Sequence, residues 1–82
     1  MKNLIYIEEY LKNKIHNMPE FAISQSVTLD RKIEYWARLS MTDENDYYTD
    51  FVQVNGSSLG EVAGKIARHL KSGKHYKDGR YL

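Results

Sequence analysis

Apolar and polar residues alternate through the middle of the chain. From 33 to 41 every second residue is apolar, and the residues between are polar or charged except for Trp36. A two-residue period in a stretch rich in β-branched and aromatic residues is typical of a strand with one buried face. A polar cluster follows at 42–46, and β-prone residues resume at 47. The pattern predicts an antiparallel hairpin with strands at 32–42 and 47–54.

The same alternation precedes this hairpin. Phe21, Ile23, Val27 and Leu29 alternate with mostly small polar residues and predict a strand at 21–29.

The segments before and after the three predicted strands have helical periodicity instead. Apolar residues recur every three or four positions from Leu4 to Met18, which predicts a helix at 3–18 that ends before the proline at 19.

A second helix is predicted at 58–72. Ser58 and Glu61 have the Ser-x-x-Glu spacing of a capping box, and Gly73 is a natural stop. The apolar stripe of this helix comprises Leu59, Val62, Ala63, Ile66, Ala67 and Leu70. We therefore expect an α+β protein, a two-layer helix–strand–strand–strand–helix domain at 1–82 with a three-stranded antiparallel sheet and a loosely ordered basic tail at 73–82.

Composition narrows the class of protein. The 82 residues are 41% hydrophobic and 28% charged, an ordinary globular balance, and they include no cysteine. Disulfides and thiolate metal sites are thereby excluded. No apolar run approaches the roughly 20 residues of a membrane span, and the apolar stretch near the N-terminus is too short for a signal peptide. We expect a cytoplasmic protein with no membrane association.

Aromatic residues and an arginine fall on the side of the sheet opposite the predicted core. If Val52 and Val54 face the helices, Phe51 points away with Trp36 and Arg38 unless a bulge near Asp50 changes the assignment. Such a group is typical of protein interfaces and of platforms on which unpaired bases stack. A face covered by other segments, or buried in a homodimer, is the structural alternative.

Tyr47 and the acidic turn extend this candidate surface. The turn contains Asp43, Glu44 and Asp46, which we expect to make secondary contacts to a partner. Asp50 follows close to the hairpin tip, where acids commonly initiate turns. The turn lacks the glycine and terminal glutamate of a calcium-binding EF-hand loop.

Positive charge is concentrated at the C-terminal end. Residues 60–82 have six basic and two acidic side chains, a net charge of +4 in a chain whose total is +1. A basic helix and tail can neutralise phosphates, although a solvated helix face has the same composition. The candidate nucleic-acid contacts are Lys65, Arg68, Lys71, Lys74, Lys77 and Arg80.

The predicted order of elements, with Val-Asn-Gly-Ser-Ser before a helix that contains Lys65 and Arg68, resembles that of double-stranded RNA-binding domains. That family has a lysine cluster at the start of its second helix. Here those positions are Leu59, Gly60 and Glu61, so the resemblance concerns topology and assigns no RNA-binding residue.

No catalytic or metal-binding motif is present. His69, His75 and Asp78 do not have a recognised ligand spacing, and we expect the histidines to be surface residues, with no metal and no cofactor. No nucleophile–base–acid combination or phosphate-binding glycine loop is apparent, so we expect a protein that is not an enzyme.

These patterns favour a small binding protein that docks on a macromolecular partner, a protein before any other, and inhibits or regulates it. Small accessory proteins of phages and plasmids include many such inhibitors. Trp36, Arg38 and Phe51 are the expected anchors. The alternatives are a nucleic-acid-binding domain that uses the basic helix and tail, and a structural subunit of a homo-oligomer.

Overall fold

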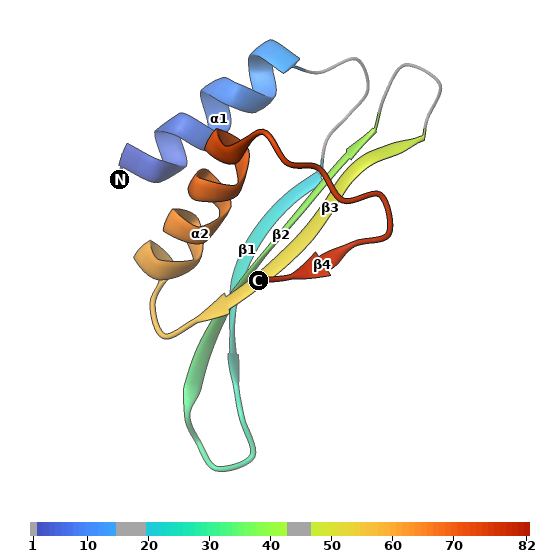
Figure 1. Cartoon of the computed structure of the whole chain (residues 1–82). Coiled ribbons are helices and arrows are strands. Elements are labelled where there is room, and N and C mark those ends of the chain that lie inside the picture. The colour runs from blue at the N-terminus through green and yellow to red at the C-terminus, as the bar shows by residue number, and fades with distance from the viewer. Residues whose placement is uncertain (1, 15–19, 43–46) are drawn as a thin grey trace.

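The computed structural model describes residues 2–14, 20–42 and 47–82. Two helices form one layer and a sheet forms the other (Figure 1). The elements in chain order are α1 (Lys2–Lys14), β1 (Glu20–Val27), β2 (Ile33–Thr42), β3 (Tyr48–Gly56), α2 (Leu59–Ser72) and β4 (Arg80–Tyr81). The predicted α+β class is confirmed, and so is the order of its first five elements.

The prediction of a three-stranded antiparallel sheet is wrong. The strand order is β1-β2-β3-β4, and the short β4 pairs with β3 in parallel. The tail expected to be loosely ordered is instead held along the free edge of β3 by backbone hydrogen bonds. Phe51 N–H donates to Tyr76 O at 3.0 Å, and Leu82 N–H donates to Gln53 O at 2.9 Å. These hydrogen bonds satisfy edge groups of β3.

Several predicted boundaries move for local reasons. The strand expected at 21–29 ends at Val27, because Arg31 N–H donates to Thr28 O at 2.9 Å in a turn where Arg31 has a φ of 65°. Residues 15–18 of the helix predicted at 3–18 lie outside the described residues. Ser58 caps α2, and its hydroxyl accepts the N–H of Glu61 at 3.1 Å as a capping box requires.

The core lies between α2 and the central strands. Alternate residues of β2 and β3 point toward the helices, and α1 packs against α2 to close the layer. The buried apolar residues are Ile7, Leu11, Ala37, Leu39, Met41, Val52, Val54, Val62, Ala63, Ile66, Ala67 and Leu70. These include most of the second predicted helical stripe and the predicted inner face of the hairpin from Ala37 onward.

The β1–β2 hairpin extends beyond the helix layer (Figure 1). A ten-residue strand spans about 33 Å, whereas a 14-residue helix spans about 21 Å, so α2 cannot cover the whole of β2. The side chain of Ile33 shares the inner face with Leu39 but is 53% exposed, and Val27 and Leu29 at the same end are also exposed. We call residues 26–33 the arm.

Candidate functional site

The face of the sheet opposite the helices is the candidate site. Within the described residues no helix covers it, because both helices pack on the face that holds the core (Figure 1). Residues directly opposite on paired strands share a face, so the register defines this surface. Its members on β1, β2 and β3 are Glu20, Ala22, Ser24, Ser26, Glu34, Trp36, Arg38, Ser40, Phe51, Gln53 and Asn55, which we call the outer face.

The guanidinium of Arg38 lies close to two aromatic rings on the outer face. Its Cζ is 5.7 Å from the ring centroid of Trp36 and 6.0 Å from that of Phe51. All three residues are half-buried. A cation near aromatic faces gains about 0.5–2 kcal/mol per contact, depending on its desolvation. The rings therefore hold the guanidinium in a fixed position on the sheet surface.

One nitrogen of Arg38 is left without a partner. Its Nε is buried and makes no hydrogen bond with any described residue. Buried donors are rarely unpaired, because the lost hydration is not replaced. The group is thus held by its aromatic contacts and not by hydrogen bonds at Nε.

The tail adds an aromatic residue that the sequence did not indicate as part of this surface. Tyr81 of β4 lies beside Gln53 in the parallel register and is 74% exposed. It therefore continues the cross-strand row that contains Arg38 and Gln53. No pattern in the tail signals this placement, because β4 is two residues long and its pairing depends on where α2 ends.

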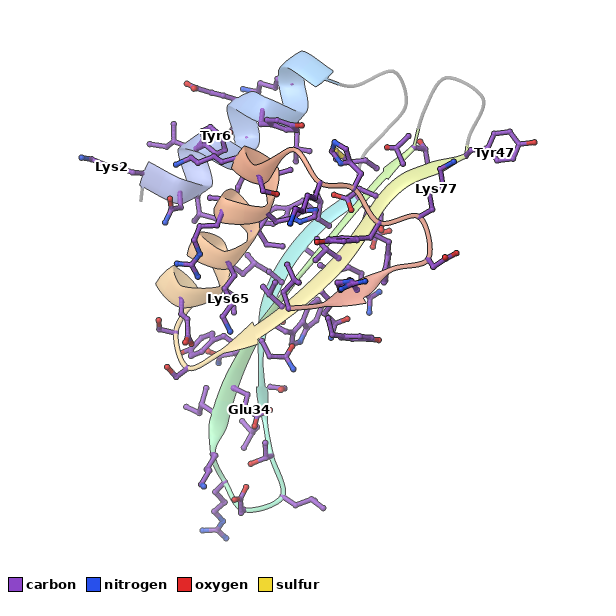
Figure 2. All side chains as sticks on the ribbon, viewed as in Figure 1. Lys2, Tyr6, Glu34, Tyr47, Lys65 and Lys77 are labelled. Atoms are coloured by element: carbon purple, nitrogen blue, oxygen red, sulfur yellow. The ribbon has the colours of Figure 1, made fainter. Side chains whose placement is uncertain are left out.

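Charge on the outer face is sparse. Arg38 is the one basic residue among its members on β1, β2 and β3, and Glu20 and Glu34 lie toward opposite ends. Glu34 is in the part of β2 that leads into the arm (Figure 2). The surface is therefore an aromatic and polar one with a single central cation.

Of the rest of the predicted partner surface, the structure describes Tyr47. Tyr47 precedes β3 at the loop end of the β2–β3 hairpin, and its ring is 72% exposed and extends outward (Figure 2). Asp43, Glu44 and Asp46 lie outside the described residues. The outer face alone thus forms the candidate site.

The six candidate nucleic-acid contacts do not form one surface. Lys65, Arg68 and Lys74 line an open pocket of about 400 Å³ beside α2. Lys71 Nζ instead lies 4.7 Å from the ring centroid of Tyr6 in α1, on another side of the helix.

Two further basic residues lie in the tail. Arg80 stacks over the ring of Tyr76 with its Cζ 4.6 Å from the centroid. Lys77 lies toward the end of the molecule occupied by Tyr47, far from Lys65 (Figure 2). The predicted basic patch is therefore reduced to the three residues of the pocket.

A buried polar cluster corrects two expectations. Asp50 was expected near a solvated turn, and the histidines were expected at the surface, but Asp50 is fully buried and His69 is 5% exposed. The Nε2 atom of His69 lies 2.5 Å from Oδ2 of Asp50, and Nδ1 of His75 lies 3.5 Å from the same oxygen. Tyr76 N–H donates to the other oxygen, Oδ1, at 3.0 Å.

Two patterns in the sequence indicate that Asp50 and His69 are buried. Asp50 is two residues before Val52 and four before Val54, so strand alternation places it on their inner face. His69 follows Ile66 by three residues and Val62 by seven, so helical periodicity places it on the apolar stripe of α2. A register shift does lie between Met41 and Thr42, beside Asp50, but Phe51 pairs with Ser40 and so stays on the face of Trp36 and Arg38.

Comparisons with protein-family models, with curated proteins and with solved structures found no match to this chain. No described helix has both the length and the apolar character needed to cross a bilayer. The function must therefore be argued from the residues themselves.

Proposed function

We propose that the protein binds another protein through the outer face and thereby inhibits or regulates that partner. The observation that supports this proposal is the position of Arg38, whose guanidinium lies near the rings of Trp36 and Phe51 on a sheet face without a helix over it. Tryptophan and arginine are among the residue types enriched at the energetic centres of protein interfaces.

The chemistry of the outer face favours a particular kind of partner. Arg38 presents a fixed planar cation, which a carboxylate can pair with through two parallel hydrogen bonds. The surrounding rings supply apolar area, and docking would remove water from the pair and strengthen it. We therefore expect a partner segment in which an aspartate or glutamate is flanked by apolar side chains.

The charge distribution favours a protein over a nucleic acid at this surface. A phosphate backbone would meet one cation, Arg38, and would also approach Glu20 and Glu34. Nucleic-acid binding depends on several phosphate contacts, each of which needs a basic group. A single carboxylate needs only one.

Site-specific photocrosslinking tests the proposal. A photoreactive residue at Gln53, in the centre of the outer face, is compared with one at Lys32 in the exposed turn of the arm. In the cells that produce the protein, we expect Gln53 to capture one protein species reproducibly, and Lys32 not to capture it. Arg38→Ala should abolish the crosslink while leaving the chain folded. Capture that persists in Arg38→Ala would contradict a role for the guanidinium.

A second candidate function uses the pocket beside α2. Lys65, Arg68 and Lys74 line it, and three basic residues on one concave surface can contact three phosphates. Lys65 Nζ also donates to Asn55 O at 2.6 Å, so part of its capacity is already used. Binding to duplex RNA should then weaken roughly 40-fold between 50 and 200 mM salt. A flat salt response would exclude this candidate.

A further inference from the structure

Three side chains of types that commonly bind metal ions lie close together, where β3, α2 and the segment after α2 meet. Asp50 comes from β3, His69 from the last turns of α2, and His75 from the segment that follows the helix. One carboxylate oxygen and two imidazole nitrogens lie within 4.8 Å of one another. The segments are distant in sequence, so the fold itself brings these three atoms together.

We propose that Asp50, His69 and His75 bind a divalent transition-metal ion, and that zinc is the ion their donor set suits best. Two imidazoles and one carboxylate are a common set of three protein ligands for zinc sites that keep a fourth position open. Calcium and magnesium prefer oxygen ligands alone, so this donor set disfavours them. Nickel and copper also accept imidazole and are the closest competitors.

The distances require an adjustment on binding, because the three ligand atoms lie within 4.8 Å of one another but are not equally spaced. Ligand atoms about 2.1 Å from a tetrahedral zinc ion lie roughly 3.4 Å apart. The separation of 3.5 Å between His75 Nδ1 and Asp50 Oδ2 already fits. The separation of 2.5 Å between His69 Nε2 and the same oxygen is that of a hydrogen bond and must widen by about an ångström. The ion would replace the proton that now bridges these two atoms.

Neighbouring groups already support the ligands. Tyr76 N–H donates to Asp50 Oδ1 at 3.0 Å, which fixes the carboxylate and leaves Oδ2 toward the histidines. The Tyr76 ring stacks on the His69 ring with centroids 5.2 Å apart and an interplanar angle of 24°. Partners of this kind orient metal ligands and are part of a working site.

An ion can reach the cluster from solvent. The side chain of His75 is 39% exposed, whereas those of Asp50 and His69 are almost fully buried. His69 also lines the open pocket beside α2 together with Lys65, Arg68 and Lys74. These cations repel a metal ion at long range, but they favour hydroxide or another anion as its fourth ligand.

Metal titration of the untagged, chelator-treated chain tests the site. We expect one zinc ion to bind per chain in calorimetry with a Kd below about 10 µM, and Co²⁺ to give the visible absorption of a tetrahedral complex. At a free zinc concentration of about 100 times Kd, the Tm should rise by roughly 15 °C. Binding weaker than 100 µM, or with no defined stoichiometry, would overturn the proposal.

Matched histidine variants locate the ion. His75→Ala removes the exposed ligand and should fold, and we expect it to lose at least tenfold in zinc affinity along with the zinc-dependent rise in Tm. His16→Ala removes a histidine that is more than 30 residues from the three ligands in sequence, and it should bind zinc as the wild type does. Equal binding by His75→Ala and the wild type would overturn the proposed site, because the ion would then bind without His75.

Discussion

Gly79 lies directly against the ring of Phe51. A Cβ built on Gly79 would be 2.6 Å from a carbon of that ring, and the φ of Gly79 is 86°. Both features require glycine, because an L-residue at positive φ is strained and the ring leaves no room for a methyl group. The contact links the tail to the aromatic cluster of the outer face.

Gly79→Ala should therefore destabilise the protein. We expect the free energy of unfolding in urea to fall by about 2 kcal/mol, from backbone strain and from displacement of Phe51. Gly60→Ala is the matched control, since its Cβ would meet nothing closer than 4.0 Å and alanine favours a helix. The control should be neutral or stabilising by up to about 1 kcal/mol. Equal effects of the two substitutions would contradict the docked position of the tail.

The Asp50 carboxylate should contribute strongly to stability even without a metal ion. In Asp50→Ala the Nε2 of His69 and the N–H of Tyr76 lose their acceptor within the buried cluster. Unpaired buried donors cost about 1–3 kcal/mol each, so we expect a loss on the order of 3 kcal/mol in urea unfolding with chelator present. Asp78→Ala, at an exposed position, should change the value by less than about 0.5 kcal/mol.

If Asp50→Ala is as stable as Asp78→Ala, the buried hydrogen bonds do not hold the tail. Such a result would also remove the basis for a preformed metal site at this position.

Replacing two residues on the same predicted strand face by alanine should lower the stability by very different amounts. Leu39 is fully buried, whereas Ile33 is 53% exposed on the arm. Leu39→Ala should lower the free energy of unfolding by about 2–5 kcal/mol. Ile33→Ala should cost less than about 1 kcal/mol. Similar losses in urea denaturation would show that the arm is packed against other parts of the molecule.

Glu61 should make stability depend on pH. Hydrogen bonds from Ser57 lower the pKa of the Glu61 carboxyl from its ordinary value of 4.5, and nearby Lys65 and Arg68 act in the same direction. Because the folded state has the lower pKa, the stabilisation is complete above pH 4.5 and is lost as pH falls through the folded-state pKa. The stability difference between wild type and Glu61→Gln should therefore shrink in acid. A difference that stays constant from pH 6 to 3 would contradict this.

Local patterns predicted most of the fold, because the apolar residues of most elements follow either the period of a strand or that of a helix. Alternation around Leu39 and Val52 defined the faces of the hairpin, and the Ser58–Glu61 spacing located the start of α2. The exposed arm was also foreseeable, since a 14-residue helix is shorter than a ten-residue strand.

The rest depends on tertiary placement. Nothing local indicates that Arg80 and Tyr81 pair in parallel with β3, because two residues have no period and the pairing needs the preceding turn. The cluster of Asp50 and His69 followed the expected periods, but a polar residue on an apolar stripe is recognised as buried only when its partner is known. Asp50 and His69 are 19 residues apart, so no local pattern in the sequence connects them.

Replacement of Trp36 by alanine tests the central claim most directly. The claim is that the indole belongs to a binding surface and not to the core, which its half-buried position supports. The two measurements are the free energy of unfolding and the affinity for the protein that crosslinks to Gln53.

We expect Trp36→Ala to lose at least tenfold in affinity while the free energy of unfolding falls by no more than about 1–2 kcal/mol, less than the 3–5 kcal/mol typical of a core tryptophan. Lys32→Ala, in the exposed turn of the arm and outside the outer face, is the control and should retain binding. A collapse of the unfolding transition, or full affinity without the indole, would contradict the proposed function.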